Sequence, residues 1–452
     1  MTYSEKNKER FLNELIDFLS IPSISTDDKH KPDIQQAAVF VKNALKRAGA
    51  DHIEIIQTAK HPIVYAEAVT DATLPTILVY GHYDVQPADP LDLWESEPFD
   101  PMIRNGRIYA RGASDDKGQV YSHIKALEIL NKEGAAYNIK FMIEGEEEIG
   151  SPNLFDFVRD HAETLAADTV LISDTSFVSP HNPSIPVGVR GLSYIEVEVT
   201  GPNRDLHSGI YGGAIANPAN VLARMIAALH DERGRVTIPG FYDQVRNLPQ
   251  AERGAINRRP FDAPAYKKDL GIKEVYGEAG YTTLERIGIR PSLDVNGIWG
   301  GYMGPGAKTV LPAKATAKIS MRLVPDQDHE EISRAITAYL KDLAPHSVKI
   351  KVKMEHGAPP AVVSIHTDGF LAAEKAVEAV WGKKPIPAYE GGTLPIVSLM
   401  KEAITEDIVM LGFGLDSDRI HSPNESYRID HYYKGIETLV AYHKARAAQK
   451  KS

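Results

Sequence analysis

Cysteine is absent from this chain of 452 residues. Its absence excludes disulfide bonds, thiolate metal ligands and a cysteine nucleophile, and leaves His, Asp and Glu as the strong metal ligands. No apolar run approaches the roughly 20 residues that a membrane-spanning helix needs. The net charge is −10 with acidic and basic residues interspersed, which argues against a nucleic-acid surface.

The composition that remains, 43% hydrophobic and 25% charged, is typical of a globular protein, and the length suffices for two or three domains. The first residues, MTYSEKNKERFLNELIDFL, are polar and amphipathic and contain no signal-peptide core. We therefore expect a cytoplasmic protein with neither a nucleic-acid nor a membrane partner.

Hydrophobic patterns indicate two kinds of sheet. Up to about residue 186, helices alternate with buried strands, which is typical of an α/β sandwich. Segments such as 193–200, SYIEVEVT, instead alternate polar and apolar residues, as strands with one wet face do. We predict a discontinuous α/β domain, residues 1–186 and 365–452, interrupted by an α+β two-layer lid domain at residues 187–364 with a β-α-β-β-α-β-like order.

Helix ends carry local signals. Ser4 and Asp33 are N-cap candidates for the first two helices, Gly49 is typical of a residue that ends a helix, and Ser151 before a proline predicts another start. Residues 231–290 are rich in Arg, Gly and Pro and are too long for a simple loop, so we expect them to pack against something specific.

The segment Thr76 to Pro87, TILVYGHYDVQP, is the first candidate for chemistry. Its apolar run ends at Gly81 and predicts a buried, central, parallel strand. His82 and Asp84 follow, and side chains two positions apart on an extended chain share one face. Asp84 could then orient the imidazole while its other nitrogen binds a metal. A hydrogen-bonded surface pair is the simpler alternative.

Further acidic groups stand where strands are expected to end, at the edge of an α/β sheet where ligands bind. RGASDDKGQ places Asp115 and Asp116 on a tight turn, and EGEEEIGS places four carboxylates within five positions after a buried strand. Asp174 ends the strand TVLISD, and His421 follows a later strand. A helix cap and a solvated acidic run are the alternatives for the first two. Together, the nitrogen and oxygen donors suit two divalent ions, Zn²⁺ or Mn²⁺, that share a carboxylate.

The motifs GHYDVQP, RGASDDKG, EGEEEIGS, LHSG, RLVP, EGGT and HSPNE occur in this order over nearly the whole chain. In this they resemble the co-catalytic metallopeptidases that include carnosine-type and Cys-Gly dipeptidases, glutamate carboxypeptidase and acylornithine deacetylases. The long lid and the phrase YEGGTLP are most similar to the cytosolic dipeptidase branch. The resemblance implies a zinc-peptidase-like catalytic domain, an α/β/α sandwich with a mixed sheet, and a lid that also forms a homodimer.

The resemblance also implies the metal ligands. His82, Asp115 and Asp174 would hold one divalent ion, and Asp115, Glu148 and His421 would hold the other. Asp115 would bridge the two ions, and the peptide bond that follows it is expected to be cis.

By the same resemblance, Glu147 would be the general base and Asp84 would orient His82. This chain has three consecutive glutamates where the family has two, so the assignment depends on counting from the glycine that follows them. On that count Glu146 is the extra residue. A shift by one position would exchange the base and the ligand.

Substrate contacts are implied in the lid and after it. His207 in LHSG would stabilise the oxyanion from a second subunit, and Arg322 in RLVP could clamp a substrate carboxylate. An exposed sheet arginine is the alternative for Arg322. His356, Gly392 and Thr393 would be further substrate contacts.

The expected reaction is metal-dependent hydrolysis of a short peptide, most of all a dipeptide. A metal-bridging water, with its pKa lowered from about 15.7 towards about 7, would lose its proton to Glu147 and attack the amide carbonyl. An N-acyl amino acid deacylase of the same family is the alternative within enzymes. A binding protein without catalysis is the alternative outside them.

Overall fold

The computed structural model describes residues 2–449 and divides the chain into two compact units. Unit 1 comprises Met1–Val187, Val363–Ala388 and Leu399–Ser452, and unit 2 comprises Gly188–Val362 and Tyr389–Ser398. The segment Tyr389–Ser398, which the sequence pattern assigned to the first domain, therefore belongs to unit 2. Within residues 2–449, no helix is both long enough and apolar enough to cross a lipid bilayer.

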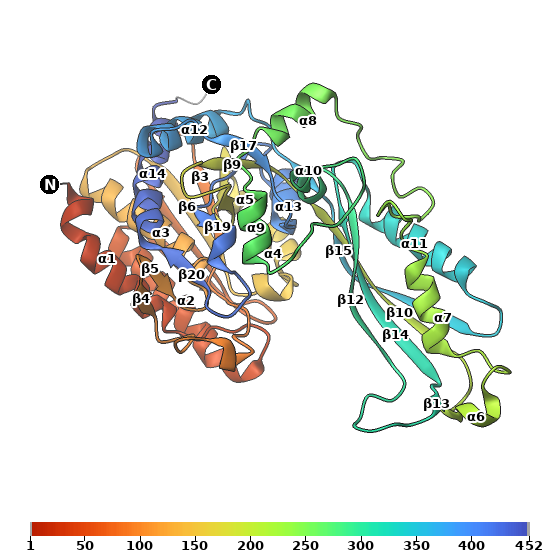
Figure 1. The fold of residues 1–452 in the computed structure, drawn as a ribbon. Coiled ribbons are helices and arrows are strands. Elements are labelled where there is room, and N and C mark those ends of the chain that lie inside the picture. Colours follow the sequence, from red (N-terminus) through yellow and green to blue (C-terminus); the bar gives the residue numbers. More distant parts are fainter. Residues whose placement is uncertain (1, 450–452) are drawn as a thin grey trace. The chain divides into compact units, whose positions relative to one another are not determined.

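Unit 1 is built on a mixed six-stranded sheet of order β1-β2-β6-β3-β7-β18. Two of its central strands, β3 and β6, are labelled in Figure 1. The strands are β1 (His52–Ile56), β2 (Ile63–Val69), β3 (Ile77–His82), β6 (Asn138–Glu144), β7 (Thr169–Ile172) and β18 (Ile408–Met410). The last four run parallel, whereas β1 and β2 are antiparallel to their neighbours. Every residue of β3 is buried, as predicted for a central parallel strand.

Helices of unit 1 pack against this sheet and against one another. They are α1 (Tyr3–Leu19), α2 (Lys31–Ala48), α3 (Lys117–Lys132), α4 (Leu154–Asp160), α5 (Ala162–Leu165), α12 (Asp368–Trp381) and α14 (Ile429–Ala447). Helix α2 contacts β1 and β2, α3 contacts β3, and α14 contacts both α3 and α12. Helix α13 (Pro395–Ala403) begins in unit 2 and ends in unit 1.

Three of the four predicted helix ends are wrong. Gly49 ends α2 in the left-handed conformation, as predicted. Thr2 rather than Ser4 caps α1, because its hydroxyl accepts the third amide of the helix. Asp33 lies inside the first turn of α2, and Asn153 rather than Ser151 precedes α4.

Short strands of unit 1 hold the loops near the sheet edge. They are β4 (Met102–Arg104), β5 (Arg107–Tyr109), β8 (Ser176–Phe177), β19 (Gly414–Leu415) and β20 (Ser426–Arg428). Strand β20 pairs with β5 and β19 pairs with β8. The described part of the unit also contains the 3-10 turns η1 (Asp28–His30), η2 (Leu91–Leu93), η3 (Glu147–Ile149) and η4 (Asp416–Asp418).

Unit 2 has two layers, an antiparallel sheet of order β12-β14-β10-β15 and helices that pack on it. These elements are β10 (Gly191–Thr200), α7 (Pro218–Ala227), β12 (Ser292–Gly300), β14 (Lys314–Leu323), α11 (His329–Leu343) and β15 (Lys349–Ala358). Their order is β-α-β-β-α-β, as predicted. Buried and partly exposed residues alternate along β10, which places Ile195, Val197 and Val199 in the core of this unit.

Residues 231–290 pack within unit 2 and contain three short helices, α8 (Gln250–Asn257), α9 (Ala263–Asp269) and α10 (Thr283–Gly288). Arg290 forms a bidentate ion pair with Glu278, at 2.7 and 2.8 Å, inside this segment. Strand β11 (Leu206–His207) pairs with β13 (Val310–Leu311) and is followed by the short helix α6 (Ser208–Tyr211). The chain passes between the two units at the strands β9 (Ser184–Val189), β16 (Ala361–Val362) and β17 (Ile386–Tyr389).

Candidate metal centre

The carboxyl end of β3 delivers the first candidate ligand. His82 is the last residue of this strand, and its side chain is completely buried. Gly81 precedes it because helix α3 approaches closely: a Cβ at position 81 would lie 2.7 Å from Asp116 Oδ2. The same Asp116 oxygen accepts a hydrogen bond from the backbone N–H of His82, at 3.3 Å. The glycine therefore lets the strand and the start of α3 place their functional residues side by side.

Asp115 lies on the turn before α3, and its peptide bond with Asp116 is cis, as expected. Its carboxylate stands between two imidazoles. Oδ1 is 3.2 Å from His82 Nε2, and Oδ2 is 2.9 Å from His421 Nε2. A carboxylate with one oxygen toward each imidazole has the geometry that a bridging ligand requires.

Two groups of three side chains meet at Asp115. His82, Asp115 and Asp174 form one, and Asp115, Glu148 and His421 form the other, with the ligand atoms of each group within 4.8 Å of one another. We call them the His82 triad and the His421 triad. The five side chains proposed as ligands thus come together within unit 1, from loops at the carboxyl ends of parallel strands and from the turn before α3.

Asp84 links the His82 triad to the glutamate-rich turn. The backbone oxygen of Asp84 accepts a hydrogen bond from His82 Nδ1 at 3.1 Å, and its carboxylate lies 3.4 Å from the same nitrogen. This carboxylate also accepts the backbone N–H groups of Glu147 and Glu148, at 3.2 and 3.0 Å. Because Nδ1 donates to Asp84, the lone pair of His82 Nε2 faces the triad.

The three consecutive glutamates have three different surroundings. Glu148 belongs to the His421 triad, with Oε2 3.3 Å from the imidazole. Glu147 is half-buried beside the triads but is a member of neither. The buried Glu146 points the other way, where it accepts hydrogen bonds from the backbone N–H of His61 at 2.7 Å and from Asn153 Nδ2 at 2.8 and 3.0 Å.

Charge in this cluster favours a cation. Burial raises the pKa of Asp174 to about 7, and the negative charge of the nearby Asp115 adds to this increase. Burial also raises the pKa of Glu147 well above its usual range, and hydrogen bonds with Asp115 and Glu148 raise the pKa of His421 to about 11. His82 Nε2 is buried, and its 3.2 Å contact with Asp115 Oδ1 lacks the geometry of a hydrogen bond. A divalent cation would neutralise the carboxylates and use this nitrogen, so the residues present fit a metal site.

Two proposed substrate residues touch in unit 2. Arg322 Nη1 on β14 donates to Thr393 Oγ1 at 2.7 Å. The neighbouring carbonyl of Gly392 accepts the backbone N–H of Arg190 at 2.9 Å, and Arg190 Nε donates to Gly391 O at 2.8 Å. Arg190 therefore anchors the loop that presents Thr393 to the Arg322 guanidinium.

The two proposed histidines of unit 2 have separate positions. His356 lies on β15, where its ring stacks on Tyr194 with centroids 4.8 Å apart. His207 is exposed at the end of β11, and its Nδ1 accepts the backbone N–H of Gly209 at 3.0 Å. That hydrogen bond requires Nδ1 to be unprotonated, so the neutral ring carries its proton on Nε2 and can donate there.

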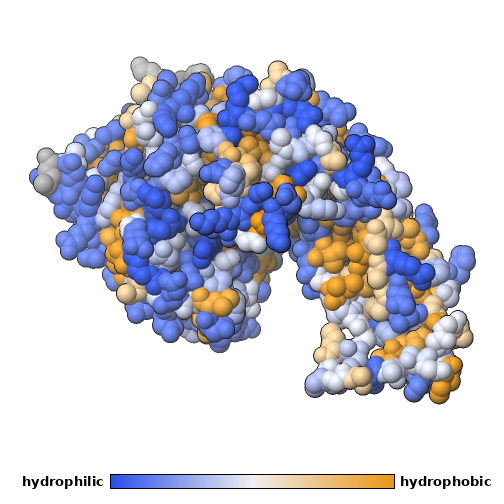
Figure 2. Space-filling model, in the orientation of Figure 1, coloured by the Kyte–Doolittle hydropathy of each residue, from blue (hydrophilic) through white to orange (hydrophobic). Residues whose placement is uncertain are grey.

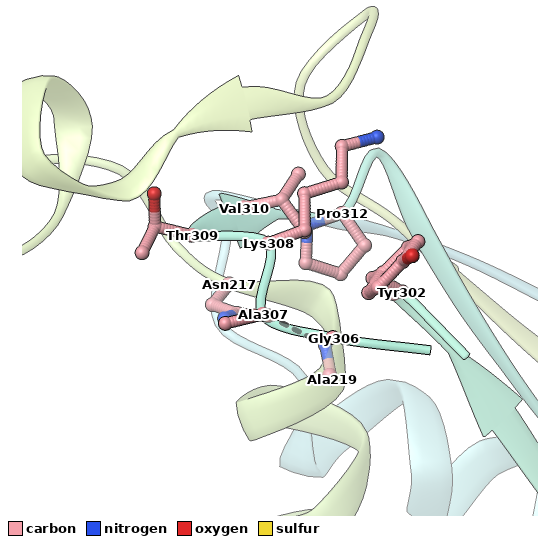
Figure 3. Close-up of a pocket in the computed structure, with 10 residues that line it drawn as sticks. Asn217, Ala219, Tyr302, Gly306, Ala307, Lys308, Thr309, Val310 and Pro312 are labelled. Carbon is pink, nitrogen blue, oxygen red and sulfur yellow. Dashed lines mark hydrogen bonds between the residues drawn. The ribbon is translucent and has the colours of Figure 1, made fainter. Parts of the chain in front are cut away.

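A separate cavity of about 420 Å³ lies in unit 2 (Figure 3). Its lining includes Asn217, Tyr302, Lys308 and Val310, and none of the five proposed metal ligands. Val310 pairs with His207 across β13 and β11. The cavity thus adjoins the strand pair β11–β13, which carries the exposed His207.

Sequence reasoning missed two buried carboxylates that support the cluster. Glu146 was counted as the extra glutamate, although it anchors the turn that carries Glu147 and Glu148. Glu425 is the last residue of the motif HSPNE, four positions after His421, and it was given no role from the sequence. Its place inside a recognised motif was the available signal.

A mixed α/β sheet with two carboxylate-bridged triads at its edge defines a metallohydrolase type of protein. Residues 78–445 match the model of peptidase family M20/M25/M40, and the chain belongs to this family. The expected family resemblance and fold class are therefore confirmed, and the protein is an enzyme of the peptidase class.

Several relatives are similar over nearly their full length. The Cys-Gly metallodipeptidase of Candida albicans is 34% identical, covering 97% of this chain and 95% of its own. The solved structure of human carnosine dipeptidase 1 has a TM-score of 0.88 at 30% identity and covers 99% of this chain and 98% of its own. An M20 family metallo-carboxypeptidase from Sulfolobus solfataricus has a TM-score of 0.88 at 35% identity, with 97% and 99% covered.

Proposed function

We propose that the protein hydrolyses the amide bond of short peptides, above all dipeptides, in a metal-dependent reaction. The observation that carries this proposal is the pair of triads sharing Asp115 at the carboxyl edge of the sheet. Similarity to the Cys-Gly metallodipeptidase and to carnosine dipeptidase supports dipeptides as the substrate class.

The proposed cofactors are two divalent ions, Zn²⁺ or Mn²⁺, one in each triad. Imidazole nitrogens and carboxylate oxygens without thiolates are a donor set that suits both metals. When bound, such ions lower the pKa of a water molecule and polarise the amide carbonyl. Asp115 would keep the two ions at a fixed spacing, and Asp84 would hold His82 in the tautomer that presents Nε2.

Glu147 is the proposed general base. It would take the proton of the attacking water and later give it to the leaving amine. Support comes from its place beside the triads and from its backbone N–H, which Asp84 holds at 3.2 Å. Arg322 and Thr393 are the proposed partners of the substrate carboxylate, with Gly392 and His356 as further contacts.

A homodimer with His207 acting across the interface is the proposed assembly. The Nε2–H tautomer of this exposed histidine supports a role as oxyanion donor. Hydrophobic surface gathers on unit 2 (Figure 2), where Ile210, Ile298 and Met303 are exposed, which supports an interface on this unit. A cytoplasmic location stays a proposal based on composition and charge, which cell fractionation tests.

A substrate panel tests the proposed function. Metal-free protein is reloaded with Mn²⁺ or Zn²⁺ and given dipeptides, longer peptides and N-acetylated amino acids, and the released amine is measured. We expect dipeptides to be cleaved fastest. Faster cleavage of acetylated amino acids would indicate a deacylase. Release of the last residue from longer peptides would indicate a carboxypeptidase, which the similarity to the Sulfolobus enzyme favours as the second candidate.

Substrate recognition by Arg322 has its own test. A dipeptide amide, which lacks the terminal carboxylate, should bind the wild type more weakly than the free dipeptide. Arg322→Leu should weaken binding of the dipeptide and leave that of the amide nearly unchanged. Equal losses for both substrates would contradict the proposed contact.

Mixing two inactive variants tests the assembly. His207→Ala and Glu147→Gln homodimers should each hydrolyse slowly, whereas a mixed dimer contains one site with both groups intact. Random subunit exchange should restore about a quarter of wild-type activity, because half of the dimers are mixed and each has one complete site. If ion-exchange chromatography, which separates the dimers by the charge that Glu147→Gln removes, shows exchange and activity does not return, His207 does not act across an interface.

A further inference from the structure

We propose that Glu425 is a positioning residue for the metal centre: its carboxylate fixes the turn that carries Asp115 relative to the segment that carries His421. This inference rests on the proposed metal site. Glu425 is completely buried and lies four positions after His421. It is neither a member of a triad nor part of the proposed proton transfer.

The carboxylate of Glu425 is surrounded by donors from one turn. Oε1 accepts the backbone N–H groups of Ser114 at 3.0 Å and Asp115 at 3.1 Å. Oε2 accepts the backbone N–H of Gly112 at 3.0 Å and Arg111 Nη1 at 2.7 Å. Because one of these bonds is to the amide of Asp115 itself, the carboxylate of Glu425 sets the position of the bridging residue's backbone.

Arg111 extends this arrangement to a third segment. Its guanidinium is buried, pairs with Glu425 and donates from Nη2 to the carbonyl of Pro87 at 3.0 Å. Pro87 ends the segment that contains His82 and Asp84. The Arg111–Glu425 pair thus joins three of the segments that supply the triads: the one after β3, the turn before α3 and the loop of His421.

General cohesion of these segments is already supplied by the backbone. Strand β20 pairs with β5, and the backbone oxygen of Glu425 accepts the N–H of Ala110 at 3.1 Å. The side chain is not needed to bring the two segments together. Its charge and the four hydrogen bonds that it accepts instead fix the conformation of the turn from Gly112 to Asp115. This turn carries the proposed bridging ligand, so its conformation affects metal binding.

Replacing this carboxylate should therefore change metal binding more than folding. In Glu425→Gln, the amide NH₂ faces N–H donors on one side of the turn, so at least two of the bonds are lost and the turn must move. Loss of a residue that orients metal ligands typically costs about tenfold to a hundredfold in metal affinity. We expect a loss of this size for Mn²⁺.

The experiment measures Mn²⁺ binding to metal-free full-length protein by competition with a fluorescent chelator, together with the unfolding midpoint of the metal-free form. Glu128→Gln is the matched control, because Glu128 is a buried carboxylate of the same unit that pairs with Arg10 and Lys125 on α1 and α3. Glu425→Asp is the second variant: it keeps the charge opposite Arg111 and shortens the reach to the turn.

The expected result is weaker Mn²⁺ binding in both Glu425 variants and unchanged binding in Glu128→Gln, even where the control is equally destabilised. If Glu425→Gln does not fold, Glu425→Asp decides by the same comparison. Wild-type affinity in the variant that folds would overturn the proposal, and so would an equal loss in Glu128→Gln. A wild-type protein that binds Mn²⁺ but cleaves no peptide would overturn the proposed function and leave this inference standing.

Discussion

Replacing Glu146 by alanine separates the roles of the three consecutive glutamates. Glu146 is 2% exposed and accepts hydrogen bonds from the backbone N–H groups of His61 and Asn153, from Asn153 Nδ2 and from Thr58 Oγ1. Alanine leaves these donors without the acceptor. It leaves the side chains of the proposed metal ligands and of the proposed base chemically unchanged.

The magnitude follows from the groups that are left unpaired. The buried N–H of His61 should cost about 1–3 kcal/mol, and the half-buried donors of Asn153 should add less. A total of about 3 kcal/mol lowers the melting temperature of a unit of this size by about 6–12 °C. The assay is thermal and urea unfolding of the metal-free protein, followed by circular dichroism.

Glu148→Ala is the matched control for this measurement. It removes a carboxylate from a crowded cluster, so the metal-free protein should keep its stability within about 1 kcal/mol, while the affinity for the metal falls. Equal losses of stability in the two alanine variants would refute the reasoning. So would a Glu148→Ala variant that binds metal as the wild type does.

Three further predictions concern activity and pH. Glu147→Gln should lower kcat by about 10²–10⁴-fold with unchanged metal content, measured by atomic absorption, and an undiminished kcat would show that the base is another residue. Dialysis against a chelator should abolish hydrolysis, and Mn²⁺ should restore it; activity that survives in protein proven metal-free would exclude the mechanism. Burial lowers the pKa of His123 and His443 to about 3, so both fold uncharged and their contribution to stability is complete above about pH 6.5. As the pH falls from about 6.5 to about 3, each of these histidines should lower the free energy of unfolding by about 1.4 kcal/mol per pH unit. In urea unfolding, a variant with glutamine in place of both histidines should lose less stability over this pH range.

Periodicity was sufficient to predict most of the fold. Apolar residues at helical spacing between a turn and a loop mark residues 117–132, and these residues form α3. The predicted order includes a strand at the place of β12, but the residues of this strand could not be located. Most of them are exposed and the register shifts between Val295 and Gly297, so no alternation marks the strand. Ser4 was named as the cap, but Thr2, two positions earlier, also carries a hydroxyl that can accept a helix amide, so residue type does not separate the two.

The candidate site was predictable to the extent that strand ends converge. Carboxyl ends of parallel strands share one edge of a sheet, which is why His82 and Asp174 could be placed together. Hydrophobic pattern alone does not distinguish Glu146 from Glu148, which only the count within the family motif separated, because adjacent identical residues differ only in what the rest of the chain packs against them. The same holds for Glu425, whose four donors become visible only when the turn at Asp115 is folded.

Exposure differs sharply between the two imidazoles of the cluster: His82 is sealed from solvent, whereas the side chain of His421 is 53% exposed. Ions held at these positions should therefore exchange with the medium at unequal speeds. The ion beside His421 should leave first and be the one replaced when another metal is offered. Preparations with mixed metal content would then reflect the order of loading, with the inner ion acquired early and kept.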